Sequence, residues 1–333
     1  MKNRFCIFIA LAVLSGCSLI DDDLSVCGVD CRIDYTMRLQ TNMRETVYDV
    51  LHAETDRSLA DTLANWLAPI FSAQAHDVEL SFYSADDGQD ALRHHSTEVV
   101  DASSTTFTFY LPRENYYHLA VVNSSDNAGV RLSGTEHSAT YAVATPDQDT
   151  LPSMQSAVYT ARLAINAAGD ADSYTYTVDL YMTSCAVALA LDSKAEEMRH
   201  IDAYLCGTAS RFEVGDSTFV YTDSRPVRCE QVTERCYAAV SLPSPDMTET
   251  PAGAPKRAME QDVYWQLKVY VTLPDGTVTE TVLDIDYPLH ADALEIIRCA
   301  VQDNGSVLPV ENAHIGATVQ LDWKQGSEHE IDI

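Results

Sequence analysis

Apolar and polar residues alternate with a period of two along much of this 333-residue chain. Successive side chains of a strand point to opposite faces, so this alternation indicates strands with one buried and one solvated face. The pattern is typical of antiparallel sheets packed as β-sandwiches and predicts an all-β protein. The clearest alternating segments are Ile33–Leu39, Val78–Phe82, Phe107–Leu111, Tyr159–Ile165, Tyr174–Leu180, Val263–Leu273 and Ile315–Trp323.

One segment has the periodicity of a helix instead. From Asp56 to about Phe71, apolar residues recur three and four positions apart, and Asp56 fits an N-cap. We therefore expect a single short helix, in the first domain, that crosses an edge or an end of a sandwich.

Proline-rich segments separate the strands. Pro274-Asp275-Gly276 predicts a hairpin turn, because proline and glycine supply the backbone angles that a tight turn needs. The segment 144–153 has two prolines and no apolar period, so we place a domain boundary there. This gives an N-terminal sandwich over 31–148 and a C-terminal one over 154–333. The segment 243–255 is expected to be an exposed loop of the second sandwich.

The N-terminus carries the features of a secretory signal. Lys2 and Arg4 precede an uncharged apolar run that is too short to cross a bilayer. Leu14-Ser15-Gly16-Cys17 follows directly and resembles the lipobox of bacterial lipoproteins. We therefore expect residues 1–16 to be removed and Cys17 to become a lipidated first residue, with two or more acyl chains as a durable anchor. An ordinary cleavage site beside a chance cysteine is the alternative.

The charge of the chain limits its partners. It has 21 basic and 50 acidic residues, and removal of Lys2 and Arg4 with the signal leaves 19 against 50, a net charge of −31. Such a surface repels phosphate backbones and anionic headgroups, so we expect no nucleic-acid partner and membrane contact through the lipid alone. Residues 17–30, with Asp21, Asp22 and Asp23, are expected to form a solvated tether.

Seven cysteines remain besides Cys6 and Cys17. The odd number leaves at least one unpaired within the chain. Cys27 and Cys31 are close enough in sequence to bridge, as are Cys229 and Cys236, and the sequence leaves both pairings open. Buried thiols are expected for the others, since they lie in apolar strand-like segments: Cys185, Cys206 and Cys299.

Neither catalysis nor a metal site has a motif to support it. The sequence has no nucleophile elbow, phosphate-binding loop or zinc-protease motif, so we expect no enzyme and no cofactor. Asp86-Asp87-Gly88-Gln89-Asp90 offers oxygen ligands for calcium but lacks the spacing of an EF-hand, which favours an acidic turn. Three tryptophans could stack on sugars, but each falls on the apolar phase of its segment, which favours the core: Trp66, Trp265 and Trp323.

In their order and spacing, several segments resemble the FimB-type fimbrial anchor lipoproteins, which form the membrane-bound base of type V fimbriae in Gram-negative anaerobes. The helix-like segment and the extra cysteines depart from that pattern. The matching segments are the lipobox, Cys27–Cys31 opening a strand that reaches Met43, Val78–Tyr83, the acidic turn ending at Gly88, Leu111-Pro112, Tyr116-Tyr117, Leu119–Asn123, Val319–Lys324, Gly326 and Glu330–Ile333.

This resemblance implies two transthyretin-like β-sandwich domains of about seven strands each. It also implies a lipid-anchored, surface-exposed protein of the cell outer membrane, with Asp21, Asp22 and Asp23 as an acidic export signal. Its partner would be a fimbrial shaft subunit, held by strand addition at an exposed sheet edge, and the protein would terminate assembly of the shaft.

Two other readings stay open. A surface glycan-binding lipoprotein would need exposed aromatic side chains in a flat platform, and a lipid-anchored hydrolase would need a pair of catalytic carboxylates. The anchor reading needs an incomplete or displaceable edge strand. We expect the closing strand, Ile315–Trp323, to complete the second sandwich and the tail after Gly326 to matter little.

Overall fold

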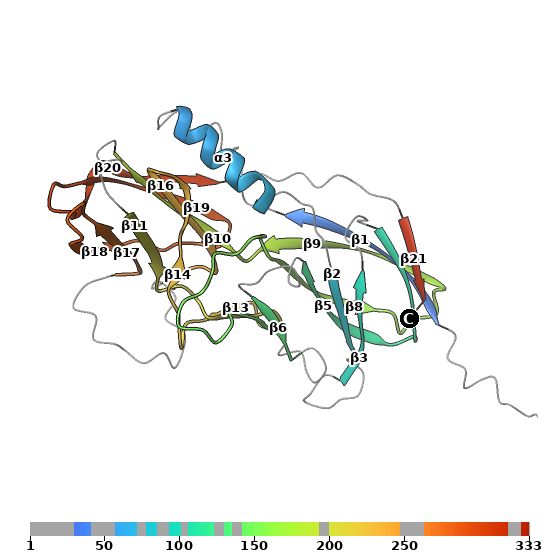
Figure 1. Cartoon of the computed structure of the whole chain (residues 1–333). Coiled ribbons are helices and arrows are strands. Elements are labelled where there is room, and N and C mark those ends of the chain that lie inside the picture. Colours follow the sequence, from blue (N-terminus) through green and yellow to red (C-terminus); the bar gives the residue numbers. More distant parts are fainter. Residues whose placement is uncertain are drawn as a thin grey trace, which may run out of the picture.

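The computed structural model describes residues 30–40, 57–71, 78–84, 93–100, 106–122, 130–134, 142–192, 200–246, 263–318 and 328–332. Its strands form four sheets (Figure 1). The largest has eight strands, in the order β21 (Glu328–Asp332), β4 (Thr106–Leu111), β1 (Cys31–Gln40), β9 (Ser173–Met182), β8 (Tyr159–Asn166), β5 (Asn115–Val122), β2 (Val78–Ser84) and β3 (Arg93–Val100).

The other three sheets are smaller. A sheet of short strands has the order β13 (Thr218–Val220), β12 (Arg211–Glu213), β7 (Ala142–Ala144) and β6 (Arg131–Ser133). A five-stranded sheet has the order β15 (Glu230–Thr233), β16 (Cys236–Ser241), β10 (Cys185–Leu191), β19 (Ala293–Val301) and β20 (Val307–Thr318). A four-stranded sheet has the order β14 (Val227–Arg228), β11 (His200–Cys206), β17 (Trp265–Thr272) and β18 (Val278–Ile285).

The eight-stranded sheet folds over to form the first sandwich by itself. Strands β8 and β9 pair only at Tyr159–Met182 and Thr160–Tyr181, so they diverge beyond that point. Strands β2 and β4 are five places apart in the sheet order. A flat sheet would separate them by roughly 24 Å, yet the ring centroids of Phe82 and Phe109 are 5.4 Å apart. The half containing β1 therefore packs face to face with the half containing β5.

A buried polar pair joins these two layers. His118 on β5 lies with its Nδ1 3.0 Å from the carbonyl oxygen of Ser81 and its Nε2 2.8 Å from Tyr35 Oη on β1. Because the carbonyl can only accept, Nδ1 carries the proton and Nε2 accepts from the tyrosine hydroxyl. The ring also stacks on Phe82, with centroids 4.4 Å apart. This pairing satisfies both polar groups and favours one alignment of the two layers.

The second sandwich consists of the five-stranded and four-stranded sheets. Strand β10 is buried along its whole length. Its valine and leucines, Val187, Leu189 and Leu191, belong to the core between these two sheets, and its alanines belong to the core of the first sandwich. The five-stranded sheet is therefore covered on both faces, and this explains why β10 reads as an uninterrupted apolar run.

The expected helix is confirmed as α3 (Arg57–Phe71). Leu63, Leu67 and Ile70 are buried, as the spacing predicted. The helix contacts β15, and its last carbonyls accept hydrogen bonds from Ala157 N (2.9 Å) and Tyr159 Oη (3.3 Å). It thus lies against the five-stranded sheet near the start of β8, where the two sandwiches meet, rather than at an edge of the first sandwich (Figure 1).

The all-β sandwich fold with one short helix is confirmed for the described residues, which place eight strands in the folded-over sheet and nine in the second sandwich. The hairpin turn is confirmed as well. Gly276 has φ +89, and Leu273 N donates to Thr277 O at 2.8 Å. Glycine fits this left-handed position because it has no Cβ to clash.

The structure differs from the predicted domain boundary. Strands β8 and β9 follow the segment 144–153, yet both lie in the eight-stranded sheet, so the chain passes to the second sandwich between β9 and β10. Leu151 is buried and tied to the second sandwich through Pro226 O and Arg228 N, at 2.8 and 2.9 Å. Proline content marks breaks between strands but carries no information on which strands pair, and that is why composition misplaced the change of sheet.

This geometry narrows the sites where a protease can cut. Within 144–153 the exposed residues are 147–150 and Pro152, which lies between the buried Leu151 and Ser153, and in the expected loop 243–255 both Pro243 and Ser244 are buried. We expect limited proteolysis to cleave at 147–150 before it cleaves any described strand, because exposed turns open at little cost. Mass spectrometry of the first fragments measures this. First cuts between Leu151 and Met154 would contradict the placement of that segment.

A second prediction concerns Glu295 on β19. Burial raises the pKa of its carboxyl from 4.5 to about 8. The unfolded chain then loses this proton before the folded protein does, so the carboxyl destabilises the fold increasingly as pH rises from 4.5 to 8. Glu295→Gln should therefore raise the free energy of unfolding at pH 7 by at most about 3 kcal/mol, and by less where solvent screens the charge. Urea unfolding at pH 5 is the internal control, since the gain there should fall to about a quarter of its value at pH 7. An equal gain at both pH values would contradict the assignment.

Candidate functional site at the start of strand β1

The residues predicted to attach the chain to a membrane precede the described part. Cys17, Asp21, Asp22 and Asp23 lie before residue 30, and the proposed calcium turn, 86–90, also falls outside the described residues. The lipidation site and the export signal therefore stay predictions. The described structure begins at Asp30, directly before β1, where the expected tether joins the folded protein.

Strand β1 lies inside the sheet, with a partner on each side. It pairs with β4 in antiparallel fashion from Cys31–Leu111 to Thr36–Thr106, and with β9 in parallel from Arg32–Ser173 to Gln40–Tyr181. Arg32 N also donates to Asp172 O at 3.0 Å, just before the pairing with β9 begins. Alternate side chains of β1 are fully buried, including Ile33 and Tyr35. The first residues after the tether are thus fixed by two hydrogen-bond ladders and by the core.

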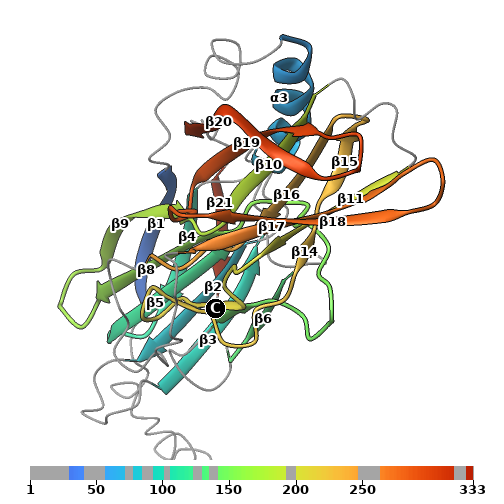
Figure 2. The same ribbon diagram turned by 90° about the vertical axis from the view of Figure 1, so that its left-hand side faces the viewer.

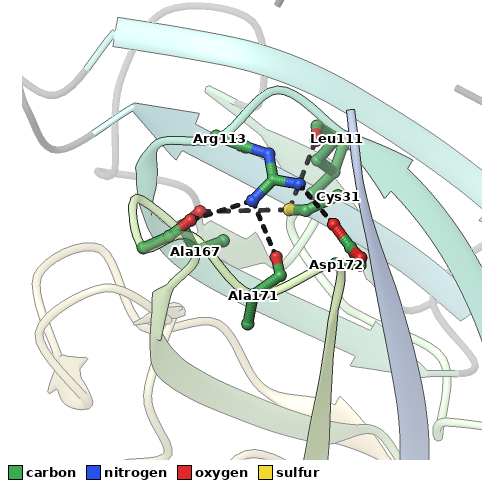
Figure 3. A network of polar contacts seen from close by, with 7 residues as sticks. Cys31, Leu111, Arg113, Ala167, Ala171 and Asp172 are labelled. Atoms are coloured by element: carbon green, nitrogen blue, oxygen red, sulfur yellow. Dashed lines mark hydrogen bonds and ion pairs between the residues drawn. The ribbon is translucent and has the colours of Figure 1, made fainter. Parts of the chain in front are cut away.

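Arg113, in the turn between β4 and β5, also holds this end of the sheet in place (Figure 3). Its guanidinium donates to Gly169 O (3.1 Å), Ala171 O (2.8 Å) and Asp172 Oδ1 (3.0 Å), all in the turn that joins β8 to β9. The Asp172 carboxylate is almost fully exposed, so this ion pair contributes little, and the two carbonyl contacts matter more. Arg113 lies in the turn that follows β4, so its contacts tie that turn to the turn before β9.

Cys31 completes this end of the sheet. Its thiol is buried and lies 3.4 Å from Leu111 O and 4.0 Å from Ala167 O. Burial raises the pKa of the thiol, and the nearby Arg113 partly opposes that shift. The thiol is free in the structure, and its candidate partner Cys27 lies outside the described residues.

We expect Arg113→Ala to lower the free energy of unfolding by about 1–2 kcal/mol, since two backbone carbonyls lose a charged donor. Urea denaturation of the wild type, Arg113→Ala and Arg113→Lys measures the effect. Lysine restores the charge without the fork that reaches both carbonyls, so it should recover only part of the loss. A loss below about 0.5 kcal/mol for the alanine variant would mean that the contacts do not hold the turn.

The outer edge of this sheet is formed by the end of the chain, contrary to our expectation. β21 pairs in parallel with β4, from Glu328–Thr106 to Asp332–Tyr110, so the tail adds to the first sandwich and not to the second. The closing strand β20 does complete the second sandwich, as far as the described residues reach, Thr318. The sequence of the tail shows only an alternation of polar residues, at Glu328, Glu330 and Asp332. That pattern suits a solvent-facing edge strand but gives no sign of which sheet it joins.

The remaining predicted residues are placed as follows. Trp265 and the thiols of Cys185 and Cys299 are buried, as expected, Trp66 is partly buried against the first core, and Trp323 lies outside the described residues. The bridge between Cys229 and Cys236 does not form, since both are free buried thiols. Cys206, expected to be buried, is partly exposed. In the described ranges no three potential metal ligands of the His, Cys, Asp or Glu type come together.

Sequence reasoning missed Arg113 because a lone arginine after Leu111-Pro112 carries no pattern, and its partners lie more than fifty residues away. Among the described residues, no helix is long and apolar enough to span a bilayer.

No protein-family model and no curated protein matches the chain. Solved structures do. A candidate adhesin from Bacteroides ovatus matches with a TM-score of 0.50 at 11% identity, over 84% of this chain and 91% of that one. The fimbrial anchor protein Mfa2 from Porphyromonas gingivalis matches with a TM-score of 0.47 at 14% identity, over 84% of this chain and 95% of its own. The tip fimbrial protein Mfa3 of the same organism, truncated at its C-terminus, matches with 0.43 at 8% identity, over 87% and 99%.

The match with the Bacteroides ovatus structure supports the fold, and fimbrial proteins are among the other structural neighbours. At such low identity a structural match is evidence of shared architecture only. The chain shares its two-sandwich fold with the candidate adhesin of Bacteroides ovatus, and its structural neighbours include a fimbrial anchor protein and a fimbrial tip protein.

Proposed function

We propose that this chain is a lipid-anchored protein of the cell outer membrane that holds the base of a fimbrial shaft on the cell surface and terminates its assembly. The lipobox at Cys17 supplies the anchor in this proposal, and a shaft subunit is the partner. The role requires neither catalysis nor a cofactor. The observation that carries it is the position of β1, because the segment that follows Cys17 leads directly into a strand held on both sides.

That position suits a strand under load. A pull on the tether acts at Asp30 and runs along β1, so it strains the nine residue pairs with β9 and the six pairs with β4 together. A strand at a sheet edge that is pulled sideways would instead lose its pairs one at a time. The contacts of Arg113 lie at the loaded end and resist separation of β9 from β4. A fimbria anchored through one lipidated residue needs this resistance.

For the shaft contact we propose the outer edge of β4, by strand addition. In the structure β21 covers this edge with only five residues, at the end of the chain. A strand from the shaft subunit that replaced β21 would gain main-chain hydrogen bonds for affinity and alternate side-chain positions for register. β21 then protects an edge that would otherwise recruit other chains.

Truncation after Gly326 tests this contact. The truncated chain should stay folded, and it should bind purified shaft subunits at least as tightly as the full mature chain, because β21 no longer competes for β4. Surface plasmon resonance measures the affinities, and thermal unfolding checks the fold. If the truncated chain folds but no longer binds, the tail itself is the assembly strand and the proposed edge is wrong.

The lipid anchor has its own test. With Cys17→Ala we expect no incorporation of a fatty-acid probe and recovery of the protein in the soluble fraction, whereas Cys27→Ala should behave as the wild type. Equal labelling of the wild type and Cys17→Ala would overturn the proposed attachment.

A further inference from the structure

The four-stranded sheet turns one face to the core and the other to solvent (Figure 2). Along β17, Trp265, Leu267 and Val269 alternate into the core, and the residues between them lie on the outer face. Tyr270 on β17 and Tyr204 on β11 occupy this outer face and are both partly exposed. Their ring centroids are 5.8 Å apart, at an interplanar angle of 79°. Two aromatic rings from neighbouring strands therefore meet on a solvent-facing sheet.

Planar polar groups surround the two rings and are already held in place. Asp202, opposite Tyr270 in the register, receives Arg228 at 2.9 Å and lies 2.9 Å from His200 Nε2. On the other side, Tyr270 Oη donates to Glu280 at 3.0 Å. Four residues before Tyr270 on the same strand, Gln266 Nε2 donates to Asp284 Oδ1 at 2.6 Å. Side chains fixed by each other in this way lose little freedom when a ligand binds.

A pocket continues this surface at the β11 and β14 side. Its volume is about 310 Å³, within the usual range of small-molecule sites. Three of its residues, His200, Asp202 and Arg228, also belong to the outer face, so the pocket and the tyrosines share a rim. The other polar or aromatic residues that line it are Ser153, Glu230, Gln231 and Tyr237.

We propose that this surface, formed by Tyr204, Tyr270 and the adjoining pocket, binds a neutral carbohydrate chain. A sugar ring has an apolar C–H face that packs on an aromatic ring, and hydroxyls that both donate and accept hydrogen bonds. Carboxylates, a carboxamide, a guanidinium and tyrosine hydroxyls supply the matching partners.

The charge of the surface selects against acidic sugars. This surface carries four carboxylates and two cations, and the formal net charge of the whole chain is −29. The carboxylates are those of Asp202, Glu230, Glu280 and Asp284, and the cations are Arg228 and Lys268. Uronic, sialic or sulfated units would enter a negative potential, so uncharged units are favoured. The inference is independent of the proposed anchoring role, since it concerns a sheet of the second sandwich remote in the fold from β1.

The test uses the full mature chain with Cys17→Ser on an array of neutral and acidic glycans, followed by calorimetric titration of the strongest ligand. We expect binding to neutral glycans. Tyr204→Ala and Tyr270→Ala should each raise Kd about tenfold or more, as removal of an aromatic anchor does. The double variant should lose binding. Tyr181→Ala, which removes an exposed tyrosine of β9 in the first sandwich, is the matched control and should leave Kd unchanged.

Three results would overturn the proposal: no binding to any neutral glycan, binding restricted to acidic glycans, or tyrosine variants that are folded by thermal unfolding and bind as the wild type. Both tyrosines are partly exposed, so their variants should fold. Retention of fimbriae on cells, measured with the same variants in the lipidated protein, should not change. Failure of the carbohydrate site is thus distinguishable from failure of the anchor role.

Discussion

Trp265→Ala should destabilise the second sandwich by about 3–5 kcal/mol, the usual cost of removing a fully buried tryptophan. The side chain is 1% exposed and lies between the two sheets of that sandwich. Its Nε1 donates to Tyr287 O at 2.9 Å, and its ring meets the ring of Tyr287 edge-on at 6.2 Å. Alanine would leave a cavity and a carbonyl without its donor.

Urea denaturation of the purified mature chain measures this loss. Trp66→Ala is the matched control, because Trp66 is only partly buried on α3 and should cost clearly less. Because the five-stranded sheet packs one face against each of the two cores, we expect the lesion to lower the stability of the whole chain. A loss below about 1 kcal/mol for Trp265→Ala would contradict the packing between these sheets.

His118 should make the first sandwich sensitive to acid. Burial lowers the pKa of its imidazole from 6.5 to about 4, and the hydrogen bond to Ser81 O opposes the shift only in part. The unfolded chain takes up a proton below pH 6.5, while the folded protein does so only near pH 4. Stability therefore falls as pH drops through this window, by about 3 kcal/mol in total.

The measurement is the free energy of unfolding between pH 7.5 and 4 for the wild type and for His118→Gln. Glutamine can still donate to Ser81 O and accept from Tyr35, so it keeps the polar pair without a titrating group. Between pH 6.5 and 4, the pH dependence of the free energy of unfolding should then report about one fewer proton taken up on unfolding, whatever the variant's absolute stability. An unchanged slope would show that His118 does not titrate in this window.

The fold could be predicted from the sequence where the deciding pattern is local. Strand β17 follows its period-two alternation from Trp265 to Thr272, and α3 follows its spacing of three and four. Each pattern arises from which side of one element is buried, so a short segment carries it. The turn at Gly276 was equally local, since it depends on the residues of the turn itself.

Features that depend on distant pairing could not be predicted. Nothing in β8 or β9 shows that they join β5 and β1, and nothing in Glu328–Asp332 points to β4. Tyr204 and Tyr270 are 66 positions apart in the chain, and only the register of β11 on β17 makes them neighbours. The tryptophans were the sequence candidates for sugar stacking, and they fall on the apolar phase of their segments. The sequence signal that could have located the site is a tyrosine on the polar phase of each of two alternating strands, Tyr204 and Tyr270.

The anchoring role is tested most directly by where fimbriae are found when the chromosomal copy carries Cys17→Ala. Electron microscopy with immunogold labelling of this chain counts fimbriae on cells and in the cell-free medium. We predict fimbriae shed into the medium, with the chain labelled at one end of each, and few left on cells. Wild-type numbers of cell-bound fimbriae in that strain would contradict the account.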